Sequence, residues 1–188
     1  KHVIKKLNPK SNSYILDICC GTGDFTQILA EKFAKTKVIG IDVSKKMLNL
    51  AKKKNPKGVF LQSDATNLPF KDNEFDYITA GFGLRNIENR QKAIQEIYRV
   101  LKPNGKFLHL DFGEKNFAGK IFDKFVPKLI DILGGKVLHY DYLISSKNAF
   151  PTPNELIEEF SINGFKFDNR YDYLFGAISA QIMRKSEN

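Results

Sequence analysis

The chain has 188 residues, of which 42% are hydrophobic, so it is long enough to bury the core of one domain. No apolar run approaches the roughly 20 residues that span a bilayer, and the first residues, KHVIKKLNPK, do not resemble a secretion signal. The formal net charge is +9, which raises nucleic acid or an anionic membrane as partners. Lysine-rich stretches such as KKMLNLAKKK (45–54) are, however, typical of a solvated helix face. We expect a cytoplasmic globular protein and disfavour a nucleic-acid substrate.

Strands and helices are predicted to alternate over the first 112 residues. The alternation predicts a parallel sheet with helices on both faces, in which ligands bind beyond the carboxyl ends of the strands. Strands are predicted at 13–18, 37–42, 58–64, 74–80 and 106–112, and helices at 25–34, after Ser44, and around Ile94, Ile97, Tyr98 and Leu101, with a turn at KPNG (102–105).

The pattern changes after residue 112. Residues 116–135 are predicted to be helical and are interrupted by Pro127, and residues 139–150 are aromatic and polar. We interpret about 113–150 as a substrate-side insertion within a single domain, 1–188. A capping box at TPNE (152–155) begins a helix that Gly164 can end, and 166–174 and 176–184 predict two closing strands around a turn.

A glycine loop follows the first strand in LDICCGTGDF (16–25). A dinucleotide fingerprint requires a third glycine where this chain has Thr26, and no GxxxxGK phosphate loop is present. Gly21 and Gly23 alone are weak evidence, because glycine turns are common. The adjacent Cys19 and Cys20 suit neither a disulfide nor a zinc site, so we expect reduced core residues and no metal.

Acidic residues follow several of the predicted strands. Asp42 ends the second strand, where a carboxylate can accept both hydroxyls of an adenosine ribose, although a strand-end acid can also simply cap the next helix. Asp64 and Ala65 could receive an adenine amino group, and Asp24 disfavours a phosphate beside the loop. Asp17 adds a fourth acid. These carboxylates suit a cationic adenosine compound without phosphate, and S-adenosyl-L-methionine, a sulfonium, is such a compound.

Several segments together resemble a known family. They are LDICCGTGD, GIDVSKKML, SDATNLPFKDNEFD, FGLRN, RVLKPNGKFLHLDF, YDYLISSKNAFPTPNEL and GAISAQIMRK. The chain resembles the ubiquinone and menaquinone biosynthesis C-methyltransferases, within the S-adenosylmethionine-dependent class I methyltransferases. The first segments are shared by the whole class, whereas FGLRN and the later segments are typical of this family. Asp111 in LDF, where many members have glutamate, favours the demethylmenaquinone and demethylphylloquinone branch.

The resemblance implies a fold, an activity and partners. The implied fold class is α/β, a Rossmann-like seven-stranded sheet with helices on both faces and an antiparallel last strand. The implied activity is C-methylation of a prenylated quinol, such as demethylmenaquinol, with S-adenosyl-L-methionine as the methyl donor. A homodimer and peripheral contact with the inner face of an anionic membrane are compatible with it. The family's N-terminal helices, which help to close the site, are not expected in this chain.

Site residues follow from the same resemblance. Arg85 would stabilise a developing phenolate and Asn86 would orient the quinol ring, although Arg85 could instead pair with a core acid. We assign no general base: His109, Asp111, His139, Tyr140 and Asp141 each could accept a proton, and Asp111 ranks below Arg85. The candidate cofactor contacts are Asp17, Gly21, Thr22, Gly23, Asp42, Asp64, Ala65 and Gly81.

Two other functions stay open at this point. One is an S-adenosylmethionine-dependent methyltransferase for another small molecule or RNA, because a fold does not fix the substrate. The other is a cofactor-binding module without turnover. The apolar stretch 117–133 is either core or an entrance for a prenyl tail. The sequence leaves open the choice of naphthoquinol or benzoquinol, the tail length and the oligomeric state.

Overall fold

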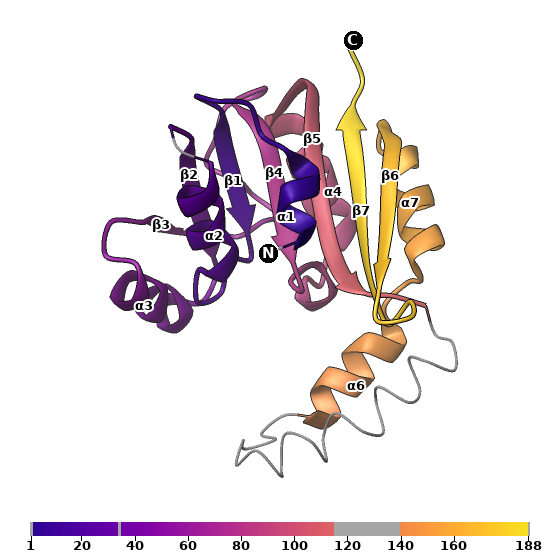
Figure 1. The fold of residues 1–188 in the computed structure, drawn as a ribbon. Coiled ribbons are helices and arrows are strands. Elements are labelled where there is room, and N and C mark those ends of the chain that lie inside the picture. Colours follow the sequence, from indigo (N-terminus) through magenta and orange to yellow (C-terminus); the bar gives the residue numbers. More distant parts are fainter. Residues whose placement is uncertain (1, 34, 115–139, 188) are drawn as a thin grey trace.

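A computed structural model describes residues 2–33, 35–114 and 140–187. Most of the predicted insertion, including the apolar stretch 117–133 and His139, lies outside the described residues. The described elements are α1 (His2–Leu7), β1 (Tyr14–Ile18), α2 (Asp24–Lys32), β2 (Lys37–Asp42), α3 (Lys45–Lys54), β3 (Val59–Gln62), β4 (Phe75–Gly81), the 3₁₀ helix η1 (Leu84–Asn86), α4 (Arg90–Val100), β5 (Leu101–Phe112), α6 (Tyr140–Ala149), α7 (Pro153–Ile162), β6 (Phe165–Tyr173) and β7 (Ile178–Lys185) (Figure 1).

The described strands form one seven-stranded sheet in the order β3-β2-β1-β4-β5-β7-β6. Strands β1 to β5 pair in parallel, whereas β7 is antiparallel to both β5 and β6. The strand order reverses between β1 and β4, which is where a sheet of this kind leaves room for a ligand beyond its carboxyl ends. The predicted parallel sheet with an antiparallel closing pair is confirmed.

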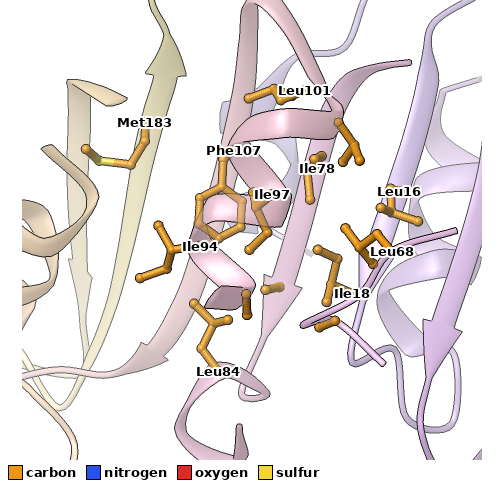
Figure 2. Packing of buried hydrophobic residues seen from close by; sticks show 14 of the residues in the cluster. Leu16, Ile18, Leu68, Ile78, Leu84, Ile94, Ile97, Leu101, Phe107 and Met183 are labelled. Carbon is orange, nitrogen blue, oxygen red and sulfur yellow. The ribbon is translucent and has the colours of Figure 1, made fainter. Parts of the chain in front are cut away.

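Helices α4 and α7 cover one face of the sheet. Ile94 and Ile97 of α4 are fully buried and belong to the same cluster as Phe107 of β5 (Figure 2). Leu84 of η1 is part of this cluster and is also fully buried. Its burial anchors the loop that follows β4 to the core.

Helices α1 and α2 pack on the opposite face (Figure 1). Val3, Ile4 and Leu7 give α1 a buried apolar side, and Leu29 of α2 lies in the same cluster. Sequence analysis did not name this helix, which its apolar residues at helical spacing form. Among the described helices, none is long and apolar enough to cross a membrane.

Strand β5 begins earlier than predicted. Leu101 pairs with Phe75 and Lys106 pairs with Tyr77, so the residues between them bulge away from β4. Asn104, within the bulge, has a φ of 60°. The turn predicted at 102–105 is therefore an irregularity inside β5, because the chain resumes pairing with the same neighbouring strand.

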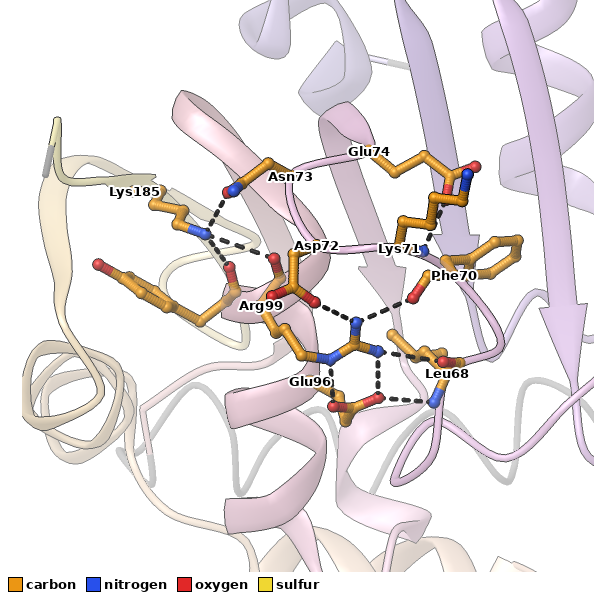
Figure 3. Close-up of polar contacts among 10 residues, drawn as sticks. Leu68, Phe70, Lys71, Asp72, Asn73, Glu74, Glu96, Arg99 and Lys185 are labelled. Atoms are coloured by element: carbon orange, nitrogen blue, oxygen red, sulfur yellow. Dashed lines mark hydrogen bonds and ion pairs between the residues drawn. The ribbon is translucent and has the colours of Figure 1, made fainter.

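Two cations fasten the loop between β3 and β4 to the rest of the fold (Figure 3). Arg99 of α4 binds the carboxylates of Glu96 and Asp72 and donates to backbone carbonyls of the loop. Lys185 of β7, only 7% exposed, donates to the Tyr98 carbonyl at 2.7 Å and to Asn73 Oδ1 at 2.8 Å. Burial lowers the pKa of Lys185. The loop so fixed begins at the carboxyl end of β3, beside the candidate site.

We expect Lys185→Met to lower the free energy of unfolding by about 2 kcal/mol, because it leaves the Tyr98 carbonyl at the end of α4 and Asn73 Oδ1 without their charged donor. Urea denaturation would measure the change. The matched control is Lys166→Met, since Lys166 is exposed on the edge strand β6 and its loss should cost less than about 0.5 kcal/mol. Equal losses in the two variants would contradict a structural role for Lys185.

Candidate active site

The glycine loop between β1 and α2 needs left-handed backbone at three positions. Cys19, Gly21 and Gly23 have φ values of 54°, 54° and 79°. A Cβ at Gly21 would meet nothing within 4 Å, so the backbone there faces open space. A Cβ at Gly23 would lie 2.9 Å from the ring of Phe60, so this glycine instead allows the loop to pack on β3.

Asp42 joins this loop to the next one. Its Oδ2 accepts the N–H of Gly21 at 2.9 Å, and its Oδ1 accepts the N–H of Ser44 at 2.8 Å. The side chain of Ser44 in turn caps α3 by accepting the N–H of Met47. The carboxylate predicted from its place at the end of β2 therefore lies against the backbone of the glycine loop.

Asp17 is 1% exposed, beneath the loop. Its two oxygens accept the hydroxyls of Thr26 at 2.6 Å and Thr79 at 2.7 Å. Burial raises the pKa of Asp17 to about 6, against the effect of these hydrogen bonds. Thr26 occupies the position where a dinucleotide fingerprint has its third glycine, and its hydroxyl has a defined partner here.

A cavity of about 780 Å³ lies at the carboxyl ends of β1, β2 and β4. Asp24, Asp42, Asp64 and Glu88 line it together with Asp17, and among the lining residues that the structure describes every charged side chain is acidic. The cavity brings together most of the predicted site, namely Asp17, Gly21, Thr22, Asp42, Asp64, Ala65, Gly81 and Asn86, whereas Gly23 and Arg85 do not line it.

The charge of Asp24 is compensated, contrary to the sequence argument. Its carboxylate accepts the hydroxyl of Thr22 at 2.7 Å and pairs with Lys54 of α3, and these contacts lower its pKa. Asp24 by itself therefore does not exclude a phosphate. The acidic character of the cavity depends on the other carboxylates that line it.

Asp64 and Ala65 form the wall at the end of β3. Asp64 Oδ1 accepts the N–H of Thr66 at 2.8 Å, and this bond lowers the pKa of Asp64. Ala65 is 7% exposed and belongs to the main core cluster. The turn is thus held in place whether or not a ligand is bound.

The loop after β4 approaches the glycine loop closely. A Cβ at Gly83 would lie 2.3 Å from the Cβ of Cys19, so position 83 has no room for a side chain. Phe82 lines the cavity with a φ of 57°. Asn86, which is exposed, lines it as well.

Arg85 lies behind this loop instead of inside the cavity. Its Nη1 donates to the Phe82 carbonyl at 2.6 Å and to Asp111 Oδ1 at 2.9 Å. The side chain of Arg85 is 9% exposed and that of Asp111 is fully buried. Arg85 therefore forms an ion pair with a core acid, Asp111, which sequence analysis gave as the alternative to a role in catalysis.

Apolar cavity residues were missed by sequence analysis. Val43 and Met47 are 68% and 41% exposed and line the cavity beside Asp42, and Phe25 lines it near Gly81. Phe25 begins the helix predicted at 25–34 and is not among the predicted site residues. One sequence signal could have indicated Val43 as a cavity residue: it is an apolar residue that directly follows the acid at the end of a strand.

The two cysteines are free. Cys20 is buried with Leu48, Ala51 and Phe60, and Cys19 is partly buried. Burial raises the pKa of Cys19 to about 12 and raises that of Cys20 as well. Across residues 2–33, 35–114 and 140–187, no group of three or more potential ligands is placed to hold a metal.

Solved structures share this fold at low identity. An S-adenosylmethionine-dependent methyltransferase from Aquifex aeolicus superposes with a TM-score of 0.75 at 20% identity, over 97% of this chain and 87% of that one. The [4+2]-cyclase SpnF superposes with a TM-score of 0.73 at 19% identity, over 100% of this chain and 79% of that one. The fold alone therefore does not fix the reaction.

Sequence relatives are closer. A demethylmenaquinone methyltransferase of Oceanobacillus iheyensis is 36% identical over 97% of this chain and 82% of the relative. The protein of the same name from Staphylococcus carnosus is 40% identical over 88% of this chain and 73% of the relative. The model of the ubiE/COQ5 methyltransferase family matches residues 1–185. With the α/β fold and the acidic cavity at its switch point, this match means that the chain belongs to the ubiE/COQ5 methyltransferase family.

Proposed function

We propose that the chain transfers a methyl group from S-adenosyl-L-methionine to a ring carbon of a prenylated quinol of the demethylmenaquinol type. Membership of the family and the names of the relatives support this reaction. The observation that supports this cofactor is the acidic cavity: within the described part of the chain, every charged residue that lines it is an aspartate or a glutamate. A sulfonium and an ammonium group are favoured there, whereas a pyrophosphate is repelled.

The residues present fit this cofactor. Each oxygen of Asp42 accepts one backbone N–H and keeps a lone pair, so the carboxylate can also accept the two ribose hydroxyls. Val43 and Met47 offer apolar surface beside it for an adenine ring. The Asp64–Ala65 turn borders the same end of the cavity and supplies polar groups for the edge of the base.

The bound cofactor supplies an electrophilic methyl group on a positively charged sulfur. The contribution of the chain is to align the acceptor carbon with that methyl group and to exclude water, which can be worth about 7–11 kcal/mol. Phe25, Phe82 and Ile87 give the cavity an apolar wall on the β4 side. The cavity has a volume of about 780 Å³, which is in the range of pockets that bind drug-sized ligands. In this proposal the acceptor ring enters the cavity along the apolar wall on the β4 side.

Asn86 and Arg85 are proposed to act on the acceptor ring in different ways. Asn86 borders the cavity, so its amide is placed to orient a ring hydroxyl. Arg85 puts a buried positive charge directly behind Phe82, where it favours a developing phenolate.

We expect Asp42→Ala to weaken cofactor binding roughly 30- to 150-fold, about 2–3 kcal/mol, because it removes the ribose acceptor. Arg85→Gln should instead keep the affinity and lower kcat on the order of 100-fold. Calorimetric titration and single-turnover methylation would measure the two effects. Asp168→Ala is the control, since Asp168 of β6 does not line the cavity. Normal affinity in Asp42→Ala, or full turnover in Arg85→Gln, would refute the corresponding assignment.

The reaction itself is tested by methyl transfer from labelled cofactor. We expect the chain to methylate demethylmenaquinol at least about 10 times faster than the demethylated benzoquinol counterpart, a difference of about 1.4 kcal/mol in the barrier. An RNA pool serves as the negative control. Methylation of RNA, or of neither quinol under conditions where the cofactor binds, would count against the proposal.

We further propose peripheral contact with an anionic membrane through α3. Apart from the residues that face the cavity, this helix exposes Lys45, Lys46, Lys52 and Lys53, together with the apolar Leu50. Exposed lysines with interspersed apolar side chains are typical of a surface that binds acidic lipid.

Vesicle flotation tests the contact. At low salt we expect the chain to float with phosphatidylserine vesicles and to stay at the bottom with neutral vesicles. Replacing Lys52 and Lys53 by glutamine should weaken partitioning to the phosphatidylserine vesicles about 30-fold, on the basis of about 1 kcal/mol per lysine. The control pair is Lys10 and Lys166, which are exposed on other elements. Chain that never floats would dismiss the idea.

A further inference from the structure

Asp17 lies in the middle of a rung that crosses the centre of the sheet. It pairs with Gly40 of β2 on one side and with Thr79 of β4 on the other. Thr79 donates its hydroxyl to Asp17 Oδ1 at 2.7 Å, and Thr26 of α2 donates its hydroxyl to Asp17 Oδ2 at 2.6 Å. Each carboxylate oxygen therefore has one hydroxyl donor, and the two donors come from different elements of the fold.

Gly40 gives Thr26 the space to reach this carboxylate. A Cβ at position 40 would lie 2.7 Å from Thr26 Oγ1, which is too close for a real contact. Thr26 and Thr79 are 1% and 0% exposed, and Asp17 is as deeply buried. Because solvent does not reach these side chains, the two hydroxyls are the side-chain donors on which a charge at Asp17 depends.

These contacts favour an ionised Asp17 in spite of its burial. A carboxylate accepts from both hydroxyls at once, whereas a protonated carboxyl has only one strong acceptor oxygen. The N–H of Thr26 lies in the first turn of α2, where the helix dipole also favours a negative charge. Burial raises the pKa of Asp17 to about 6, while the two hydroxyls and this N–H lower it. Asp17 is therefore ionised in neutral buffer and takes up a proton in acidic buffer.

Other titratable groups face Asp17 from β2 and from the glycine loop. Asp42, at the end of β2, is a like charge and raises the pKa of Asp17. The thiols of Cys19 and Cys20 have pKa values that burial raises, so both are neutral beside the carboxylate. From β4 and α2 the contacts are the two threonine hydroxyls. Loss of either hydroxyl should therefore favour the protonated form of Asp17.

The order of the strands places Asp17 between the two reactants. In the proposed function, Asp42 after β2 and Asp64 after β3 hold the adenosine, and the acceptor ring enters on the β4 side. Strand β1 lies between β2 and β4. The sulfur connects the adenosine to the methyl group that is transferred, so in this arrangement it lies over the end of β1, where Asp17 lines the cavity.

We propose that Thr26 and Thr79 are positioning residues that keep Asp17 a carboxylate below the glycine loop, and that this charge favours the sulfonium cofactor relative to its neutral product, S-adenosylhomocysteine. Neither threonine lines the cavity, so both act through Asp17. A fixed negative charge attracts the positively charged sulfur and loses this attraction when the methyl group leaves, which helps the product to dissociate. The preference rests on the proposed function, whereas the charge of Asp17 does not.

The charge is tested without a ligand by ¹³C NMR of the full chain labelled at its aspartate carboxyl groups, with Asp17→Asn to assign the signal. We expect Asp17 to titrate at higher pH in Thr79→Val, which keeps the side-chain shape and loses the donor, and as in the parent in Thr79→Ser. The matched control is Thr36→Val, which loses a hydroxyl that donates to the Phe33 carbonyl away from the cavity. An unchanged titration in Thr79→Val would overturn the proposal.

The preference is tested by calorimetric titration with each ligand, from mildly acidic to mildly alkaline buffer. The measured quantity is the Kd of S-adenosylhomocysteine divided by the Kd of S-adenosyl-L-methionine, so changes common to both ligands cancel. We expect this ratio to rise with pH in the parent as Asp17 ionises, and to be on the order of tenfold lower in Thr79→Val in neutral buffer. Thr26→Val, which removes the donor on the other oxygen, should lower it as well, whereas Thr79→Ser and Thr36→Val should keep the parent ratio.

The outcomes separate this inference from the proposed function. A parent ratio that does not change with pH would overturn the preference, and this measurement depends on no variant. Equal weakening of both ligands in Thr79→Val, with the parent ratio kept, would indicate a purely structural role for the hydroxyl and would overturn the preference as well. A parent that binds neither ligand, with the NMR result intact, would instead refute the proposed cofactor and still support the charge of Asp17.

Discussion

The carboxylate of Asp42 holds together the two loops on which the cavity depends. One oxygen accepts a backbone N–H of the glycine loop and the other accepts the N–H that begins the turn into α3. The two loops leave the carboxyl ends of the neighbouring parallel strands β1 and β2, next to the reversal in strand order between β1 and β4. The carboxylate fixes one loop relative to the other at the edge where ligands bind in sheets of this kind. Each oxygen of Asp42 still has a lone pair available after it has accepted its backbone N–H. The side chain that connects the two loops can therefore also accept hydrogen bonds from a ligand in the cavity.

Acidic and basic residues are distributed unevenly over the molecule, which the net charge of +9 does not show. The charged residues lining the cavity are acidic, whereas α3, which borders it, exposes lysines to solvent. Lys54 reaches back to pair with Asp24 at the rim. The acidic cavity therefore suits the cationic cofactor that we propose, and the exposed lysines of α3 suit the anionic membrane that we propose, so the two proposed contacts involve different residues.

Much of the fold could be predicted because its signals are local. Apolar runs followed by glycine or an acid mark the strands β1, β2 and β4, and Asp42 and Asp64 follow from their places after strands. The contacts that were missed join residues far apart in sequence. The pairing of Asp24 with Lys54, the bulge that lets β5 begin at Leu101, and the burial of Lys185 against α4 all depend on tertiary packing, which no local pattern encodes. Arg85 shows the same limit, since its motif indicates importance but not the direction in which the side chain turns.

The close approach of Gly83 to Cys19 limits the size of the side chains at two positions that are far apart in the sequence. With 2.3 Å between the Cβ of Cys19 and the place where a Cβ of residue 83 would lie, the loops after β1 and β4 touch backbone to side chain. A larger residue at position 19, or any side chain at position 83, would push the two loops apart and widen the mouth of the cavity. The contact therefore limits the volume of the side chain at position 19 and excludes any side chain at position 83, and neither limit depends on sulfur chemistry.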